Sequence, residues 1–124
     1  MNKLFLIAGP CIIENSTVPL TIGKEVKSLC DEFGIDFIFK ASYKKANRTK
    51  LESFKGIGFQ ESLEILQGVG RALGVRTITD VHESHEPELV AQYVDILQIP
   101  AFLCRQTELL LASGNTGKTI NIKK

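Results

Sequence analysis

The chain has 124 residues, a length typical of one small domain, and its 44% hydrophobic and 23% charged residues are ordinary for a globular protein. A formal net charge of +1 gives no general reason to expect binding to nucleic acid or to a membrane surface. No apolar run approaches the roughly 20 residues that span a bilayer. Three cysteines in distant segments favour reduced thiols, and the start is too short for a usual signal peptide, so the sequence predicts a cytoplasmic protein.

Short apolar runs alternate with segments of helical periodicity along the whole chain. In chain order, the patterns predict a strand at 4–8, a helix at 22–33, a strand at 37–41, a helix at 63–73, a strand at 75–81, a helix at about 87–94, a strand at 96–99, a helix at 107–112 and a strand at 119–122. Gly34 and Gly74 follow the first two helices, where glycine commonly ends a helix. This alternation predicts a parallel sheet with right-handed crossovers, either doubly wound or curving toward a barrel.

Residues 40–48, with the sequence KASYKKANR, gather cationic and amide groups directly after the strand-like apolar run Phe37–Phe39. There is no acid between Asp36 and Glu52, so the segment carries a local positive field that suits a phosphorylated small molecule. Lys40 and Ser42 stand at alternate positions and therefore share one face of an extended backbone. A buried ammonium there is costly unless an anion meets it, although a solvated basic loop is the alternative interpretation.

Polar residues lie at or just after the carboxyl end of every predicted strand, a pattern typical of a (β/α) barrel, which gathers its chemistry at the carboxyl ends of many strands. In chain order these residues are Cys11, Lys40, Ser42, Asp80, His82, Gln98, Asn121, Lys123 and Lys124. An open sheet would concentrate them at one switch point. The chain has neither a Gly-x-Gly-x-x-Gly after its first strand nor a Walker motif, which disfavours nucleotide binding.

Five motifs resemble the 3-deoxy-D-manno-octulosonate 8-phosphate synthases, relatives of the deoxy-arabino-heptulosonate phosphate (DAHP) synthases. They are Ile7–Cys11, Phe39–Ser42, Lys45–Arg48, Thr79–Glu83 and Gln98–Thr107, and the resemblance continues to Lys124. It implies an α/β fold of the (β/α)8 TIM barrel family, of which residues 1–124 would form the N-terminal part of a single aldolase-type domain. About five strands and four helices are then present, so an incomplete barrel is expected.

The resemblance also implies an enzymatic function for the completed protein. The family condenses phosphoenolpyruvate with D-arabinose 5-phosphate to 3-deoxy-D-manno-octulosonate 8-phosphate and phosphate, a step toward lipopolysaccharide, and forms homotetramers. The 124-residue chain is expected to be inactive alone. Two alternatives stay open: a DAHP synthase-type condensation with erythrose 4-phosphate, and a non-catalytic half-barrel that binds phosphorylated ligands.

Site residues follow from the matched motifs. The resemblance implies that Lys40, Lys45 and Lys123 hold phosphoenolpyruvate, with Ser42, Gln98 and the Ala101 and Phe102 backbone completing its pocket. Asn47 and Arg48 would clamp arabinose 5-phosphate, and Arg105 would serve the sugar phosphate. Asp80, Lys45 and Asn47 are the catalytic candidates, and Asp80 could move a proton or orient water. From the residues alone, Asp80 would be a loop cap and Arg105 a surface cation.

Cys11 is the candidate metal ligand, because the family has a metal-dependent form with cysteine after Gly-Pro and a metal-free form with asparagine there. In the metal-dependent form the thiolate joins a histidine, a glutamate and an aspartate around a divalent ion of the iron, zinc or manganese class. Those partners would lie beyond Lys124, so tight binding by this chain is not expected. From the residues alone, Cys11 would be a buried apolar cysteine.

Two local features remain open. Tyr43 and Lys44 stand where the family usually has Phe-Asp, which changes the local charge by two units. This change could alter the salt dependence of substrate capture or break a structural ion pair. His82, Glu83, His85 and Glu86 resemble a metal cluster only superficially, and we expect solvated loop residues, with His82 lining the site.

Overall fold

The computed structural model describes residues 3–44 and 58–124. Its strands and helices alternate in the predicted order. The elements are β1 (Phe5–Ala8), α1 (Thr17–Phe33), β2 (Asp36–Lys40), α2 (Phe59–Leu73), β3 (Arg76–Asp80), α3 (Pro87–Val90), β4 (Ile96–Ile99), the 3-10 helix η1 (Ala101–Leu103), α4 (Thr107–Gly114) and β5 (Thr119–Ile122). All five predicted strands are confirmed, whereas η1 was not predicted.

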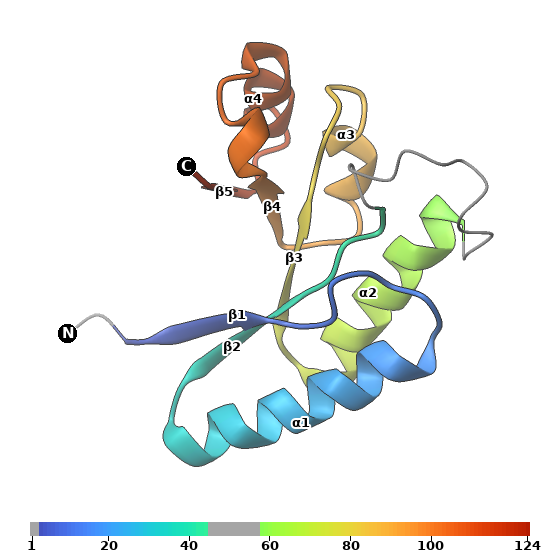
Figure 1. The fold of residues 1–124 in the computed structure, drawn as a ribbon, viewed down its shortest axis with the longest axis vertical. Coiled ribbons are helices and arrows are strands. Elements are labelled where there is room, and N and C mark those ends of the chain that lie inside the picture. The colour runs from blue at the N-terminus through green and yellow to red at the C-terminus, as the bar shows by residue number, and fades with distance from the viewer. Residues whose placement is uncertain (1–2, 45–57) are drawn as a thin grey trace.

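The five strands form one parallel sheet in which spatial order equals chain order, from β1 to β5. Figure 1 shows α1 and α2 together against one face of this sheet, with α3 and α4 toward β4 and β5. A doubly wound sheet reverses its strand order at a switch point, whereas a barrel does not. The prediction of an incomplete (β/α)8 barrel is therefore confirmed.

Side chains of the strands alternate between two apolar layers, as the pleat requires. The larger layer lies between strands and helices and includes Phe39, Leu66 and Leu97, all with 0% of their surface exposed. The smaller layer, on the other face, contains Ile38, Ile78 and Ile96, with Ile7 packed against it. Two residues beyond these isoleucines, on the same face, each of the three central strands places a polar side chain at its carboxyl end.

Both long helices end in the predicted way. Gly34 and Gly74 adopt the left-handed backbone conformation, with φ of 66° and 64°, which glycine tolerates best. Helix α1 begins earlier than predicted, because the Asn15 side chain accepts hydrogen bonds from the backbone amides of Thr17 and Val18 at 3.0 and 2.8 Å. No helix in residues 3–44 or 58–124 has the length and apolarity needed to cross a lipid bilayer.

Two details differ from the sequence expectation. Helix α3 covers only Pro87–Val90, and the rest of the predicted helix, to Val94, consists mainly of turns. In α1 the predicted apolar stripe is only partly covered: Cys30 is buried, but Leu29 and Phe33 are 54% and 70% exposed. The periodicity therefore predicted the helix correctly, but it did not show how much of the apolar face is covered by other elements.

Candidate functional site

A row of hydrogen-bonded polar side chains crosses the carboxyl ends of β2 to β5. Asp80 accepts hydrogen bonds from Ser42 Oγ at 3.0 Å and from Gln98 Nε2 at 2.6 Å. Its Oδ2 atom also lies 3.4 Å from Lys40 Nζ. Gln98 Oε1 in turn accepts a bond from Asn121 Nδ2 at 2.7 Å. The strand register explains the row, because Asp80, Gln98 and Asn121 are direct neighbours on successive parallel strands.

Asp80 is the centre of this row and is held as a carboxylate. Burial raises the pKa of its carboxyl group, but the hydrogen bond from Gln98, the charge of Lys40 and the hydrogen bond from Ser42 outweigh burial and leave the pKa below its ordinary value. The prediction that Lys40 needs an anion is thus met within the chain by Asp80. The loop-cap alternative for Asp80 is wrong, because its partners are side chains of neighbouring strand ends.

The end of β1 lies against the same rim through a close backbone approach. A Cβ atom on Gly9 would lie 1.8 Å from the carbonyl oxygen of Lys40, so any larger residue would push β1 and β2 apart. Beyond Gly9, the carbonyl of Cys11 accepts a hydrogen bond from the Ser42 amide at 3.3 Å. Gly9 is therefore the residue that lets Cys11 reach the rim.

Cys11 is exposed, so the expectation of a buried apolar cysteine is wrong. Of the other two cysteines, Cys30 is buried and Cys104 is half-buried, and all three thiols are free. In the part of the chain that the structure describes, Cys11 belongs to no group of three or more ligands that could hold a metal. One thiol does not fix a metal ion in a defined geometry, so the described residues do not fit the expected ion by themselves.

Other predicted site residues lie at the same end of the sheet but outside the row. Ala101 and Phe102 form η1 after β4 and are exposed, Phe102 completely. Arg105 follows η1 and is exposed. The backbone amide of Lys123, just after β5, donates to the Ile99 carbonyl at 3.1 Å. Lys45, Asn47 and Arg48 lie outside the described residues.

A second polar cluster, formed by Tyr43, Lys44, His82 and Glu86, joins the loops after β2 and β3. Tyr43 donates its hydroxyl proton to Glu86 Oε2, and Lys44 Nζ contacts Glu86 Oε1. Glu86 is only 2% exposed, so the expectation of a solvated loop residue is wrong for Glu86, though right for the exposed Glu83 and His85. Lys44 therefore forms an ion pair with Glu86 within this chain.

The contacts of Glu86 keep it ionised. Burial raises the pKa of its carboxyl group, but contacts from His82, Lys44 and Tyr43 outweigh burial and lower the pKa to about 2. Burial, followed by the bond to Glu86, raises the pKa of the Tyr43 hydroxyl, which therefore stays a proton donor. His82 Nδ1 lies 3.8 Å from Glu86 Oε2 and is buried without a hydrogen-bond partner.

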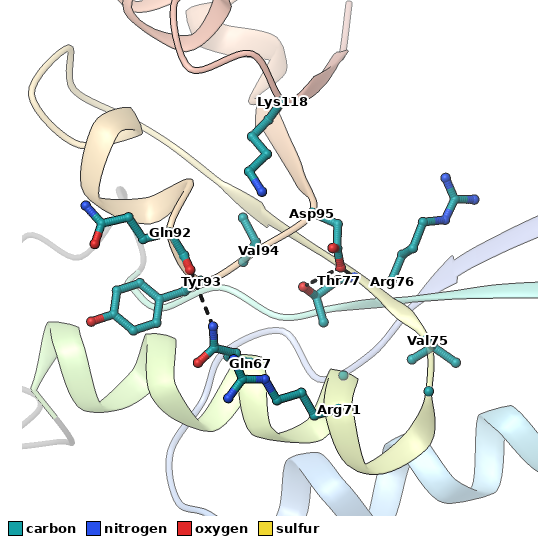
Figure 2. Close-up of a pocket in the computed structure, with 12 residues that line it drawn as sticks. Gln67, Arg71, Val75, Arg76, Thr77, Gln92, Tyr93, Val94, Asp95 and Lys118 are labelled. Carbon is teal, nitrogen blue, oxygen red and sulfur yellow. Dashed lines mark hydrogen bonds between the residues drawn. The ribbon is translucent and has the colours of Figure 1, made fainter.

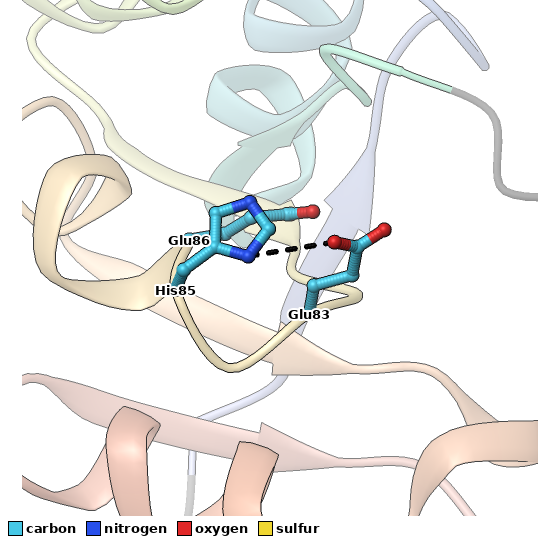
Figure 3. Close-up of side chains that lie close together, drawn as sticks. All are labelled: Glu83, His85 and Glu86. Atoms are coloured by element: carbon cyan, nitrogen blue, oxygen red, sulfur yellow. Dashed lines mark ion pairs between the residues drawn. The ribbon is translucent and has the colours of Figure 1, made fainter.

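Glu83, His85 and Glu86 also bring potential metal-ligating atoms within 4.8 Å of one another. Figure 3 shows His85 facing Glu83, with Glu86 next to them in the chain. His85 Nδ1 lies 3.4 Å from Glu83 Oε2. The ammonium group of Lys44 already pairs with Glu86 and lies 3.8 Å from Glu83. Because a cation would face that ammonium group, this cluster does not suit a metal ion.

Cavities occur at both ends of the described sheet. One of about 500 Å³, partly lined by His82, lies beside the loop after β3 and the start of α4. None of the residues of the row lines it, so the placement of His82 in the site stays a prediction. Another of about 450 Å³ lies at the amino ends of β3 and β4 (Figure 2). Arg71, Arg76 and Lys118 are among the residues that line it. Barrel enzymes place their chemistry at the carboxyl ends, so the second cavity is not the candidate site.

Comparison with known proteins decides the family. The sequence model described as the DAHP synthetase I family matches residues 1–124. The chain belongs to this family. It is 54% identical over 123 residues to the 2-dehydro-3-deoxyphosphooctonate aldolase of Citrifermentans bemidjiense. It is also 51% identical over 121 residues to the protein of that name from Synechococcus sp. and 48% identical over 124 residues to that of Campylobacter jejuni subsp. doylei.

These alignments cover 99%, 98% and 100% of the chain but only 45%, 43% and 46% of the three relatives. The chain thus spans less than half the length of the curated relatives that it matches. Their shared name denotes the octulosonate 8-phosphate synthases, so the resemblance read from the five motifs is confirmed.

Two parts of the site in this family member were not assigned from the sequence. Asn121 was noted only as a polar residue after the fifth strand, yet it completes the row by donating to Gln98. Its position opposite Gln98 in the register was the available signal. Glu86 gave no such signal, because its partners Tyr43 and Lys44 lie 43 and 42 residues away along the chain.

Proposed function

We propose that the completed protein condenses phosphoenolpyruvate with D-arabinose 5-phosphate to form 3-deoxy-D-manno-octulosonate 8-phosphate and inorganic phosphate. In this proposal residues 1–124 are the N-terminal part of a single barrel domain and are inactive alone. The row from Lys40 to Asn121 at the carboxyl ends of the strands carries the proposal. Membership of the DAHP synthetase I family, and the names of its curated relatives, support the reaction class.

The proposed chemistry uses the row for both binding and proton transfer. The nucleophilic carbon C3 of phosphoenolpyruvate forms a bond to the aldehyde carbon of the sugar, water adds at C2, and the C2–O bond to phosphate breaks. Lys40 and Ser42 supply a cation and a hydroxyl donor for the acid groups of phosphoenolpyruvate. Asp80, ionised and within reach of both, can orient the water and accept its proton.

The remaining site residues are included in the proposal because they lie in the matched sequence motifs. Lys45 and Lys123 would complete the phosphoenolpyruvate site with Gln98 and the backbone of Ala101 and Phe102. Lys45 and Asn47 would share the catalytic role with Asp80. The sugar phosphate would be bound by Asn47, Arg48 and Arg105. A cytoplasmic homotetramer is the proposed state of the completed protein.

A divalent metal is part of the proposal only for the completed protein. Cys11, exposed beside Ser42, would contribute one thiolate, and the ion would polarise the aldehyde or orient water. Three further ligands would have to come from outside this chain. The carbonyl contact between Cys11 and Ser42 supports the placement, because it brings the thiol residue to the proposed substrate rim.

A chimeric barrel tests the proposal. Residues 1–124 are joined to the part of the Citrifermentans bemidjiense relative that the chain does not match, and phosphate release from phosphoenolpyruvate is measured with each aldose phosphate. We expect release that depends on arabinose 5-phosphate, with the isolated chain as the inactive control. A preference for erythrose 4-phosphate would support the alternative named in the family description. A folded, inactive chimera that still binds phosphoenolpyruvate would favour the non-catalytic half-barrel.

A further inference from the structure

The buried carboxylate of Glu86 has no role in the proposed reaction, yet it is among the most completely enclosed charged groups in the described residues. Its side chain is 1% exposed. Oε1 contacts Lys44 Nζ, while Oε2 accepts the Tyr43 hydroxyl and lies 3.3 Å from the backbone amide of His82. A buried charge with this many donors is fixed in position.

Two neighbouring side chains converge on this one carboxylate. Tyr43 supplies the hydroxyl group and Lys44 the ammonium group, and both contact Glu86. The charge of Lys44 is therefore directed toward a carboxylate of the protein rather than toward a substrate.

The contacts of Glu86 join the two loops that flank the catalytic row. Tyr43 and Lys44 directly follow Ser42, which donates to Asp80. His82 follows Asp80 by two residues, and its backbone amide points at Glu86. Glu86 thus holds the chain on both sides of the bond between Ser42 and Asp80. A hydrogen bond of 3.0 Å across two strand ends is sensitive to small shifts of either loop.

We propose that Glu86 is a positioning residue, which with Tyr43 and Lys44 locks the ends of β2 and β3 together and so holds Ser42 and Lys40 beside Asp80. This inference rests on the proposed function, because the row that Glu86 positions is the proposed phosphoenolpyruvate site. Lys44 acts in it as the partner of Glu86 and contributes nothing directly to substrate binding.

The test is a double-mutant cycle in the chimeric barrel, with Lys44→Met, Glu86→Gln and the two combined. Each single variant leaves one half of a partly buried ion pair without its partner, whereas the double variant removes both charges. The control is the exposed α1 pair of Lys27 and Asp31, whose Nζ and Oδ2 atoms lie 2.9 Å apart, changed to Met and Asn in the same way.

Two measurements are made on each variant. The first is the rate of phosphate release at varied phosphoenolpyruvate concentration, which gives KM and kcat separately. We expect each single substitution to raise KM about tenfold or more with a smaller change in kcat, and the double substitution to recover most of the loss. The second is hydrogen exchange of the backbone amides of residues 42–44 and 80–82, which should lose protection in both single variants and regain it in the double variant.

The outcomes separate this inference from the proposed function. If KM responds no more than in the control pair, or if the double variant loses as much as the two singles together, Glu86 is not a positioning residue. If the unmodified chimera is inactive, the proposed function fails, and hydrogen exchange alone decides about Glu86. Unchanged protection in the single variants would then overturn the inference. Protection that is lost in both single variants and regained in the double variant would support a lock between the two strand ends.

Discussion

The substitution Asp80→Asn tests the row most directly, because it removes one charge and keeps the shape of the side chain. The asparagine carbonyl can still accept the hydrogen bond from Gln98 Nε2, which is 2.6 Å long in the structure. Its amide group then faces Ser42, whose hydroxyl can turn and accept a bond. What is lost is the attraction between the carboxylate and Lys40.

The magnitude of that loss follows from the geometry. Two unit charges 3.4 Å apart attract by about 5 kcal/mol at an effective dielectric constant of ~20. The side chains are 27% and 15% exposed, so solvent screening and the cost of desolvation reduce the net contribution to about 1–2 kcal/mol of folding stability. The loss of a proton acceptor should lower kcat far more, by about 10²–10⁴.

Both effects can be measured on the chimeric barrel, by urea unfolding and by phosphate release. The matched control is Asp95→Asn, at the opposite end of β3, where the carboxylate accepts a 2.8 Å bond from the Thr77 amide. We expect that control to lose stability and keep kcat. If Asp80→Asn keeps kcat within about threefold of the unmodified chimera, the carboxylate does not act on the reacting groups and the reasoning is refuted.

Three further predictions concern the rim. Gly9→Ala should prevent tight pairing of β1 and β2, because its Cβ would meet the Lys40 carbonyl at 1.8 Å. We expect the free energy of unfolding, measured in urea, to fall by about 3 kcal/mol or more, and an unchanged midpoint would contradict this. Glu86 has a folded pKa of about 2 against an ordinary 4.5, so its stabilisation, about 3 kcal/mol, should be present above pH ~4.5 and disappear as the pH falls toward 2. Glu86→Gln should flatten that part of the pH–stability curve. Asn121→Ala removes the donor to Gln98 at 2.7 Å and should raise KM for phosphoenolpyruvate several-fold with kcat little changed; an unaltered KM would exclude a role for Asn121 in the row.

The sequence predicts most of the fold because its local signals are strong and consistent. Short apolar runs bounded by polar residues found every strand, and Gly34 and Gly74 correctly marked the helix ends. The period of two along β2 predicted that Lys40 and Ser42 share a face, and both contact Asp80. Each of these inferences depends only on residues close together in the chain.

Contacts between distant residues could not be predicted in the same way. The partly buried pair of Lys44 and Glu86 spans 42 residues, and nothing in the local pattern of either segment identifies the other. The exposure of Phe33 has a similar origin, because the periodicity of α1 does not say which part of its apolar face another element covers. Lys45, Asn47 and Arg48 lie outside the described residues and stay predictions.

The paired lysines change how the rim recognises an anion. Read from the sequence, the basic segment suggests capture by an uncompensated positive field. In the structure Lys40 faces Asp80 and Lys44 faces Glu86, so both cations are already balanced within the protein. In the proposed reaction, a phosphorylated substrate would therefore share Lys40 with a carboxylate, which repels it. Its binding would then depend on precise geometry, on donors such as Ser42 and on cations from other segments. The proposed role of Glu86 in positioning these groups would therefore matter more than its neutralisation of Lys44.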